Sequence, residues 1–271
     1  MNENHIRQVA AELNLQLRQV LATAALIAEG GTVPFIARYR KEATGSLDEV
    51  AITNVRDRMV QLAELDARKD AILKSLDERK LLTDALKKSI AEALTMTRLE
   101  DIYQPYRPKR RTRATIAKEA GLEPLADFLW EQNPAANVDT EAQKFINPEK
   151  EVTDGDKALA GARDILAERI SDDAKAREQM RQLYRANAVI RSKVISGKET
   201  DAAKFKDYFD WKEPLLAAPS HRILAMRRGE AESFLMVRIQ PEEAEAVALL
   251  ASLFVSNNSA SGKQVRLVSM E

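Results

Sequence analysis

The chain has 271 residues, 45% of them hydrophobic, and its 42 Lys and Arg balance its 42 Asp and Glu. Such a chain can bury a core as one large domain or two ordinary ones, which argues against disorder of the whole. It has no cysteine, so disulfides, thiolate catalysis and thiolate metal sites are excluded. The first residues are polar where a signal peptide needs an apolar core, and no run of about 18 apolar residues occurs, so we expect a cytoplasmic protein.

Gly and Pro are scarce, nine of each, and strong helix formers dominate the composition. We therefore expect an all-α, multihelical fold with one long central helix and a small helix-turn-helix-like bundle at the N-terminus. At most one or two short strands are expected, near residues 233–239. The predicted regions are an N-terminal helical bundle with the long helix, a helical region after a basic segment, and an aromatic corner with a short strand and helix, at residues 1–103, 104–200 and 201–271.

The N-terminal pattern predicts three short helices. Apolar residues recur at helical spacing on both sides of Asn14, which is a possible left-handed break between the first two helices. Gly30 and Gly31 end the second helix, and Thr32 can cap the third. The pattern is compatible with a helix-turn-helix, but it favours a plain helical bundle because helix-turn-helix patterns are weakly specific.

One long helix is expected over residues 47–82, because no Pro or Gly interrupts them and Ser46 with Glu49 makes a capping box. Its heptad positions are apolar at both ends but carry Asp66 and Lys69 in the middle. This indicates a packing face with a polar break, not a free coiled coil.

Further along the chain, a helix beginning near Asp154 and a second one capped by Ser171 and reaching Ile195 predict an antiparallel helical hairpin. Pro241 is expected to open another helix, to about residue 255. The last residues, 263–271, alternate in polarity without a strand partner, so we expect the protein to continue beyond them.

The most informative stretch is residues 107–113, the basic connector, which holds five cations and no acid. Pro105 and Pro108 disfavour helix at the residues before them, so the segment reads as stiff and extended, with a helix starting at Thr112 or Arg113. Since the rest of the chain is slightly acidic, the connector is a local positive field that attracts phosphates.

Two clusters are candidates for nucleic-acid binding, with cations holding the backbone and aromatic rings stacking on unpaired bases. The first comprises Tyr103, Tyr106, Arg107, Lys109, Arg110, Arg111 and Arg113, and the second comprises Arg38, Arg40 and Lys41. Other interpretations stay open: the first cluster's arginines dock on acidic faces with the tyrosines in the core, or form a solvated loop. For the second cluster, Phe35, Ile36 and Tyr39 favour the alternative that the helix has a basic face in contact with water only.

Several segments resemble the Tex family of bacterial transcription accessory proteins, which are distantly similar to a eukaryotic transcription elongation factor. They are residues 31–45, 99–113, 117–127, 204–210 and 219–225, and the resemblance extends to about residue 253. Family members are longer, with an RNase H-like domain, helix-hairpin-helix elements and an oligonucleotide-binding fold after the helical part. The resemblance implies an N-terminal scaffold that assists RNA or DNA binding in transcription and positions the downstream domains.

We expect neither enzymatic activity nor a cofactor. His5 and His221 lie at opposite ends of the chain without ligand partners, so no metal site is indicated. Two alternatives remain: a protein-interaction module that binds the transcription machinery without touching nucleic acid, and a nuclease using the adjacent acids Glu100 and Asp101.

Overall fold

The computed structural model describes residues 2–108 and 110–269, and the chain divides into two compact units, Met1–Tyr106 (unit 1) and Arg107–Glu271 (unit 2). As predicted, the fold is mainly helical. Among the described residues, no helix combines the length and the apolarity that crossing a lipid bilayer requires.

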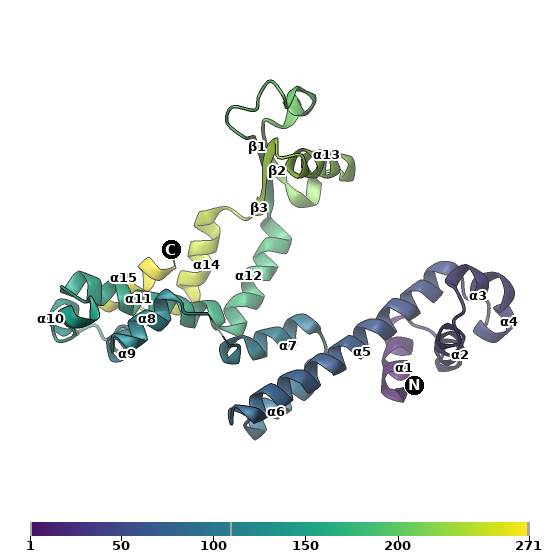
Figure 1. Ribbon diagram of the computed structural model, residues 1–271, viewed down its shortest axis with the longest axis horizontal. Coiled ribbons are helices and arrows are strands. Elements are labelled where there is room, and N and C mark those ends of the chain that lie inside the picture. Colours follow the sequence, from purple (N-terminus) through teal and green to yellow (C-terminus); the bar gives the residue numbers. More distant parts are fainter. Residues whose placement is uncertain (1, 109, 270–271) are drawn as a thin grey trace. The chain divides into compact units, whose positions relative to one another are not determined.

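Unit 1 is entirely helical in its described part (Figure 1). Its elements are α1 (Glu3–Glu12), α2 (Leu17–Ala28), α3 (Val33–Tyr39), α4 (Lys41–Thr44), α5 (Glu49–Glu78), α6 (Asp84–Ala91), α7 (Met96–Tyr103) and the 3-10 turn η1 (Gln104–Tyr106).

The 30-residue helix α5 confirms the predicted long helix. Its cap differs from the prediction: the side chain of Asp48 accepts from the amide of Ala51, while Ser46 has a left-handed backbone with φ of 62°. The polar residues in the middle of its heptad face bond other helices. Asp66 accepts from Nε2 of His5 in α1 at 2.7 Å, and Nζ of Lys69 donates to the carbonyl of Ala91 at 2.9 Å. The seam is therefore a packing face within unit 1.

Apolar clusters lie at both ends of α5. One joins α1 and α2 to its first half through Val9, Val20 and Val55, and another packs α6 and α7 on its second half. Asn14 has the predicted positive φ, 52°. A Cβ at Gly31 would lie 2.8 Å from the carbonyl oxygen of Leu26, so the close α2–α3 turn requires glycine there.

Unit 2 combines helices with a small sheet. Its α-helices are α8 (Arg113–Glu119), α9 (Glu123–Glu131), α10 (Val138–Gln143), α11 (Gly155–Asp172), α12 (Ala174–Asn187), α13 (Ser220–Ala231), α14 (Glu243–Phe254) and α15 (Ala260–Val268). Its strands are β1 (Val189–Val194), β2 (Asp210–Pro214) and β3 (Leu235–Gln240), and its 3-10 turns are η2 (Pro148–Lys150), η3 (Ala203–Tyr208) and η4 (Leu215–Ala217).

The core of unit 2 surrounds α11, whose buried face carries Ala158, Ala162, Ile165 and Leu166 against α8, α9 and α15. Residues 263–268, which alternate in polarity, belong to the helix α15. Ser259 caps α15, and Val265 inserts into this core with no exposed surface. The spacing of Val265 and Val268 is helical, and it outweighs the apparent alternation.

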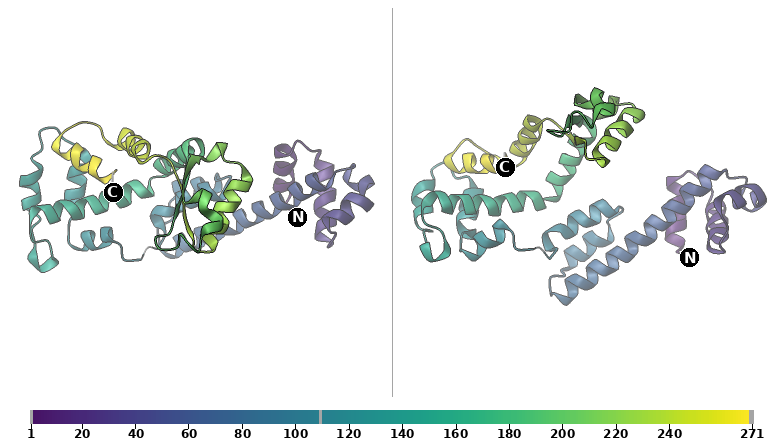
Figure 2. Two further views of the ribbon diagram at one scale, coloured as in Figure 1. Left: turned by 90° about the horizontal axis from the view of Figure 1, so that it is seen from above. Right: turned by 45° about the horizontal axis from the view of Figure 1, so that its top comes forward.

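The expected maximum of two strands is corrected to a three-stranded antiparallel sheet with the order β2-β1-β3. Strand β3 matches the predicted one. Helix α12 ends at Asn187, not Ile195, because the next residues are rich in β-branched side chains and pair with both neighbours. The predicted antiparallel hairpin is also wrong: Asp173, not Ser171, caps α12, which rises away from α11 (Figures 1 and 2).

Candidate nucleic-acid interface

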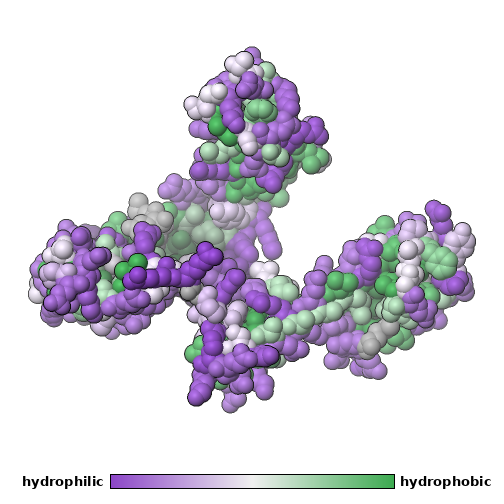
Figure 3. Space-filling view, viewed as in Figure 1, coloured by the Kyte–Doolittle hydropathy of each residue, from purple (hydrophilic) through white to green (hydrophobic). Residues whose placement is uncertain are grey.

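Helix α3 presents two aromatic side chains to solvent. Its positions divide by helical spacing: Ile36 and Ala37 are buried, whereas Phe35, Arg38 and Tyr39 lie at i, i+3 and i+4 on the outer side. Phe35 is 42% exposed and Tyr39 is 63% exposed. In Figure 3 hydrophobic residues lie at the surface among hydrophilic ones at this end of unit 1.

Cations surround these rings. We call the surface formed by Phe35, Arg38, Tyr39, Arg40 and Lys41, all exposed, the α3 patch. The ring centroids of Phe35 and Tyr39 are 5.5 Å apart, and the guanidinium carbon of Arg40 lies 5.0 Å from the Phe35 centroid. Phe35 and Arg40 also line a shallow hollow with the α2–α3 turn, where Glu29 is the acidic residue. The patch thus offers exposed π-faces beside positive charge.

Arg40 differs from the other arginines that lie over aromatic rings in the described part of the chain. Each of the others also binds a carboxylate: Arg68 with Glu100 (over Tyr103), Arg169 with Asp127 (over Trp130) and Arg222 with Glu213 (over Trp211). Arg40 donates only to the carbonyl of Tyr39, at 3.0 Å, and no described carboxylate forms an ion pair with it. Its positive charge is therefore not neutralised within the described residues.

The basic connector begins unit 2, and its described cations are all exposed. Arg111 pairs with Glu119 at 2.7 Å, and Nε of Arg113 lies 3.5 Å from Asp164. For Arg107 and Arg110, the structure gives no ion pair or side-chain hydrogen bond among the described residues. The predicted site residue Lys109 lies outside the described residues.

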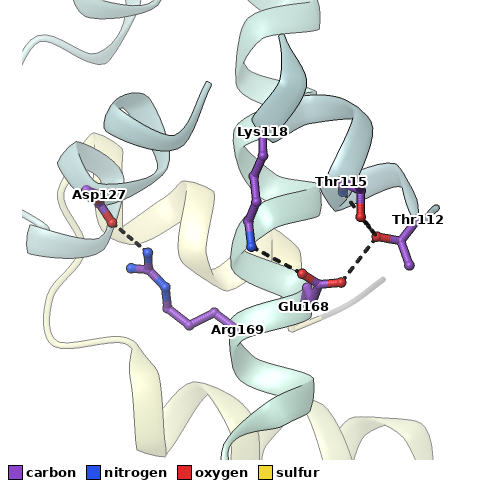
Figure 4. A network of polar contacts seen from close by, with 6 residues as sticks. All are labelled: Thr112, Thr115, Lys118, Asp127, Glu168 and Arg169. Carbon is purple, nitrogen blue, oxygen red and sulfur yellow. Dashed lines mark hydrogen bonds and ion pairs between the residues drawn. The ribbon is translucent and has the colours of Figure 1, made fainter. Parts of the chain in front are cut away.

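The end of the connector is fixed to the core of unit 2 (Figure 4). As predicted, Thr112 caps a helix there: its Oγ1 accepts from the amide of Thr115 at 3.1 Å. The same hydroxyl donates to Glu168 of α11 at 3.2 Å, and Nζ of Lys118 approaches the other oxygen of Glu168 at 3.3 Å. The connector is therefore anchored at this end, while its described cations face solvent.

The tyrosines of the first cluster end unit 1. Tyr103 is only 6% exposed, and its ring packs among residues of α5, α6 and α7 beneath the guanidinium of Arg68. Its hydroxyl lies 3.3 Å from Oγ of Ser75. Tyr106 is half-buried against the same cluster. A base can reach the ring of Tyr103 only if the ring leaves this core.

Sequence reasoning named Arg38, Arg40 and Lys41 but treated Phe35 and Tyr39 as evidence against a site. The signal was present in the spacing, since Val33, Ile36 and Ala37, at i, i+3 and i+4, supply the inward face of so short a helix. Among the described residues, no cluster of His, Asp or Glu is arranged to hold a metal ion.

Two protein-family models match the chain, one in its N-terminal part and one in its C-terminal part. The Tex-like protein N-terminal domain matches residues 3–77, and the Tex central region-like family matches residues 133–264. These ranges include α3 and all but the last residue of α5 in unit 1, and the sheet in unit 2.

Curated relatives agree with these matches. Protein tex of Bordetella pertussis is 48% identical over 86% of this chain and 30% of its own length. Transcriptional accessory protein Tex of Neisseria gonorrhoeae is 44% identical over 89% of this chain and 32% of its own length. S1 RNA-binding domain-containing protein 1 of Pongo abelii is 26% identical over 88% of this chain and 25% of its own length. The chain thus spans about a third of the length of its bacterial relatives.

Proposed function

This chain belongs to the Tex family, and we propose that it is a helical scaffold that contributes an auxiliary contact to single-stranded nucleic acid in transcription. The transcription setting is supported by the name of the Neisseria relative, and RNA as a ligand by the name of the Pongo abelii relative. The scaffold role is supported by the 30-residue helix α5, which links the apolar clusters of unit 1.

The observation that carries the proposed contact is the un-neutralised arginine beside two exposed rings in the α3 patch. Exposed aromatic rings are stacking platforms for unpaired bases, and neighbouring cations hold the phosphates. Arg40 lies over Phe35 and binds no described carboxylate, so its guanidinium can bind a phosphate while a base stacks on the neighbouring ring. Exposed Arg107 and Arg110 in the basic connector offer further phosphate contacts on unit 2.

The test is fluorescence anisotropy of the chain with labelled single-stranded RNA and DNA across a salt series. Replacing Phe35 and Tyr39 together by Ala should weaken binding. For each base that stacks on one of these rings, the expected loss is about 1–3 kcal/mol, or roughly 5- to 150-fold in affinity. The melting temperature should hardly change, because both rings are exposed.

A matched control replaces Leu94 and Tyr184, which are 66% and 41% exposed, by Ala. It should bind like the unmodified chain. An affinity that survives the loss of Phe35 and Tyr39, or no binding even at low salt, would refute the proposed contact.

We propose that the chain has no catalytic activity of its own. Glu100, one of the acids that a nuclease would use, is held by Arg68 at 2.6 Å, and Asp101 is 2% exposed. Degradation of RNA by the purified chain with Mg²⁺, abolished by Glu100→Gln with Asp101→Asn, would contradict this.

A protein-interaction module is the second candidate, and α14 favours it. This helix is rich in Ala, Leu and Val, yet none of its residues is fully buried. Suppose that the chain binds a protein of the transcription machinery in the absence of RNA and that replacing Val247 and Leu250 by Ser abolishes this binding. That result would support this candidate over the first.

A further inference from the structure

The sheet of unit 2 has one covered face and one open face. Ile190, Ser192 and Leu235 are buried on the covered face, where a Cβ at Gly229 of α13 would meet the side chain of Leu235. Ser192 there donates to the carbonyl of Tyr208 in η3. Figure 1 shows α13 on one side of the sheet.

Cations occupy the open face in register. Arg191 of β1 lies directly opposite Lys212 of β2 and Arg238 of β3, so three positive side chains form one row across the sheet. In the next row Lys193 lies between Asp210 and Met236. Lys193, Lys212, Met236 and Arg238 are all exposed.

This arrangement does not stabilise the sheet by itself, because like charges directly opposite each other repel. Glu242 offsets part of the row, since it binds Lys212 at 2.8 Å and also Arg191, and these bonds lower the pKa of the Glu242 carboxyl. Arg238 and Lys193 have no ion pair or hydrogen bond from their side chains among the described residues. The face therefore keeps a net positive charge.

We propose that this open face, the cationic sheet face (Arg191, Lys193, Lys212 and Arg238), binds the phosphate backbone of single-stranded nucleic acid. Neighbouring strands are about 4.8 Å apart, so the row of three cations spans roughly 10 Å, room for an extended strand to place successive phosphates. An interface with a folded protein would need an apolar, aromatic centre and few lysines, whereas Met236 is the main apolar side chain here. Its residues belong neither to the α3 patch nor to the basic connector.

The first test compares two triple variants in the full chain by anisotropy with labelled oligouridine RNA and the matching DNA. One carries Lys193→Gln, Lys212→Gln and Arg238→Gln. The other is a control of equal charge change, Lys175→Gln, Lys206→Gln and Arg228→Gln, at exposed positions away from the open face. Each lost phosphate contact lowers the slope of log affinity against log salt by about 0.7. Lys193 and Arg238 bind no described acid, whereas Lys212 already binds Glu242, so the first variant should lose at least about 1.4 from the slope and the control much less.

Equal slopes for the two variants, or an unmodified chain that binds neither RNA nor DNA, would overturn the proposal. The proposed α3 contact fails separately: loss of Phe35 and Tyr39 should weaken affinity with little change of slope, because neutral rings release no counterions. A difference between the RNA and DNA arms identifies the preferred backbone.

A second test does not depend on how well the charge variants fold. Because the chain has no cysteine, Met236→Cys creates a unique labelling position on the edge strand β3, directly opposite Lys193. A fluorophore there should change its emission on addition of oligouridine, and a fluorophore at Leu224→Cys on α13, 67% exposed in the unmodified chain, should not. No change at position 236 under conditions where the RNA binds would also refute the proposal.

Discussion

Two arginines of unit 1 lie over aromatic rings, and their surroundings differ in two ways. Arg68 covers Tyr103, which is buried, and its Nε and Nη2 bind both oxygens of Glu100 at 2.6 and 3.3 Å. Arg40 covers exposed Phe35, and among the described residues its guanidinium donates only to a backbone carbonyl. The first pair is a closed structural unit, and the hydrogen bond to Glu100 raises the pKa of Arg68 further. The second leaves a ring and a positive charge accessible to a ligand.

The largest expected effect is on the free energy of unfolding, and it distinguishes the buried ring of Tyr103 from the exposed ring of Tyr39. Tyr103→Ala removes a side chain from the α5–α7 core and should cost about 3–5 kcal/mol, whereas Tyr39→Ala should cost less than about 0.5 kcal/mol. Urea unfolding followed with a probe in unit 1 measures both. If Tyr103→Ala instead weakened RNA binding without loss of stability, Tyr103 would be a stacking residue and the contrast would fail.

Much of the helical framework follows from local rules. Thr32 and Thr112 precede helices as predicted, and the long helix needs only an uninterrupted run of helix formers. The sheet was harder, because β1 and β2 are separated by 15 residues and stabilise each other only through pairing. Residues 189–194 continue the apolar pattern of the preceding helix, so periodicity alone could not place its end.

The site was predictable only in its charges. The sequence identifies the cations of the basic connector and of residues 38–41, but exposure decides which aromatic rings can stack. Tyr103 and Tyr39 both lie near basic residues in the chain, and one is 6% exposed and the other 63%. The cationic sheet face was not predictable because its row depends on the register of three strands.

The next effect extends the comparison to the connector. Replacing Arg107 and Arg110 by Gln should lower the salt slope for single-stranded RNA by about 1.4, since neither has an acidic partner among the described residues. Replacing Arg111 and Arg113 should change the slope less, because Glu119 and Asp164 already lie beside them. Anisotropy across a salt series measures both, and melting curves should stay unchanged. The reverse order, with Arg111 and Arg113 dominant, would contradict the rule that un-neutralised arginines bind phosphate.

A smaller effect concerns the carboxylate that closes the first pair. Glu100→Gln should destabilise unit 1 by about 1 kcal/mol, because it weakens a bidentate, half-buried contact with Arg68. Glu92→Gln is the control, since its contact with Lys88 is 3.9 Å long and exposed; the expected cost is below about 0.5 kcal/mol. Urea titrations of the two variants decide, and equal losses would mean that Glu100 does not fix the position of Arg68.

The smallest effect tests neutralisation through pH. Arg58 donates to both oxygens of Glu12, at 2.6 and 2.9 Å, and this hydrogen bond is the main cause of the lowered pKa of the Glu12 carboxyl. A carboxyl group whose pKa is lower in the folded chain than in the unfolded chain stabilises the fold at pH values above its unfolded-state pKa. This stabilisation is lost as the pH falls through the pKa that the group has in the folded chain. The stability difference between the unmodified chain and Glu12→Gln should therefore be constant near neutral pH, at a few tenths to about 1 kcal/mol. It should shrink below about pH 4.5 in urea titrations.

Arg40→Gln supplies the contrast. Arg40 has no carboxylate partner among the described residues, so the effect of this substitution on stability should not follow the titration of any acid in that range. If the stability difference between the unmodified chain and Glu12→Gln did not change with pH, the ion pair of Arg58 with Glu12 would add nothing to folding stability. Carboxylate pairing would then not distinguish Arg40 from the other arginines, and the α3 patch would differ only in the exposure of its rings.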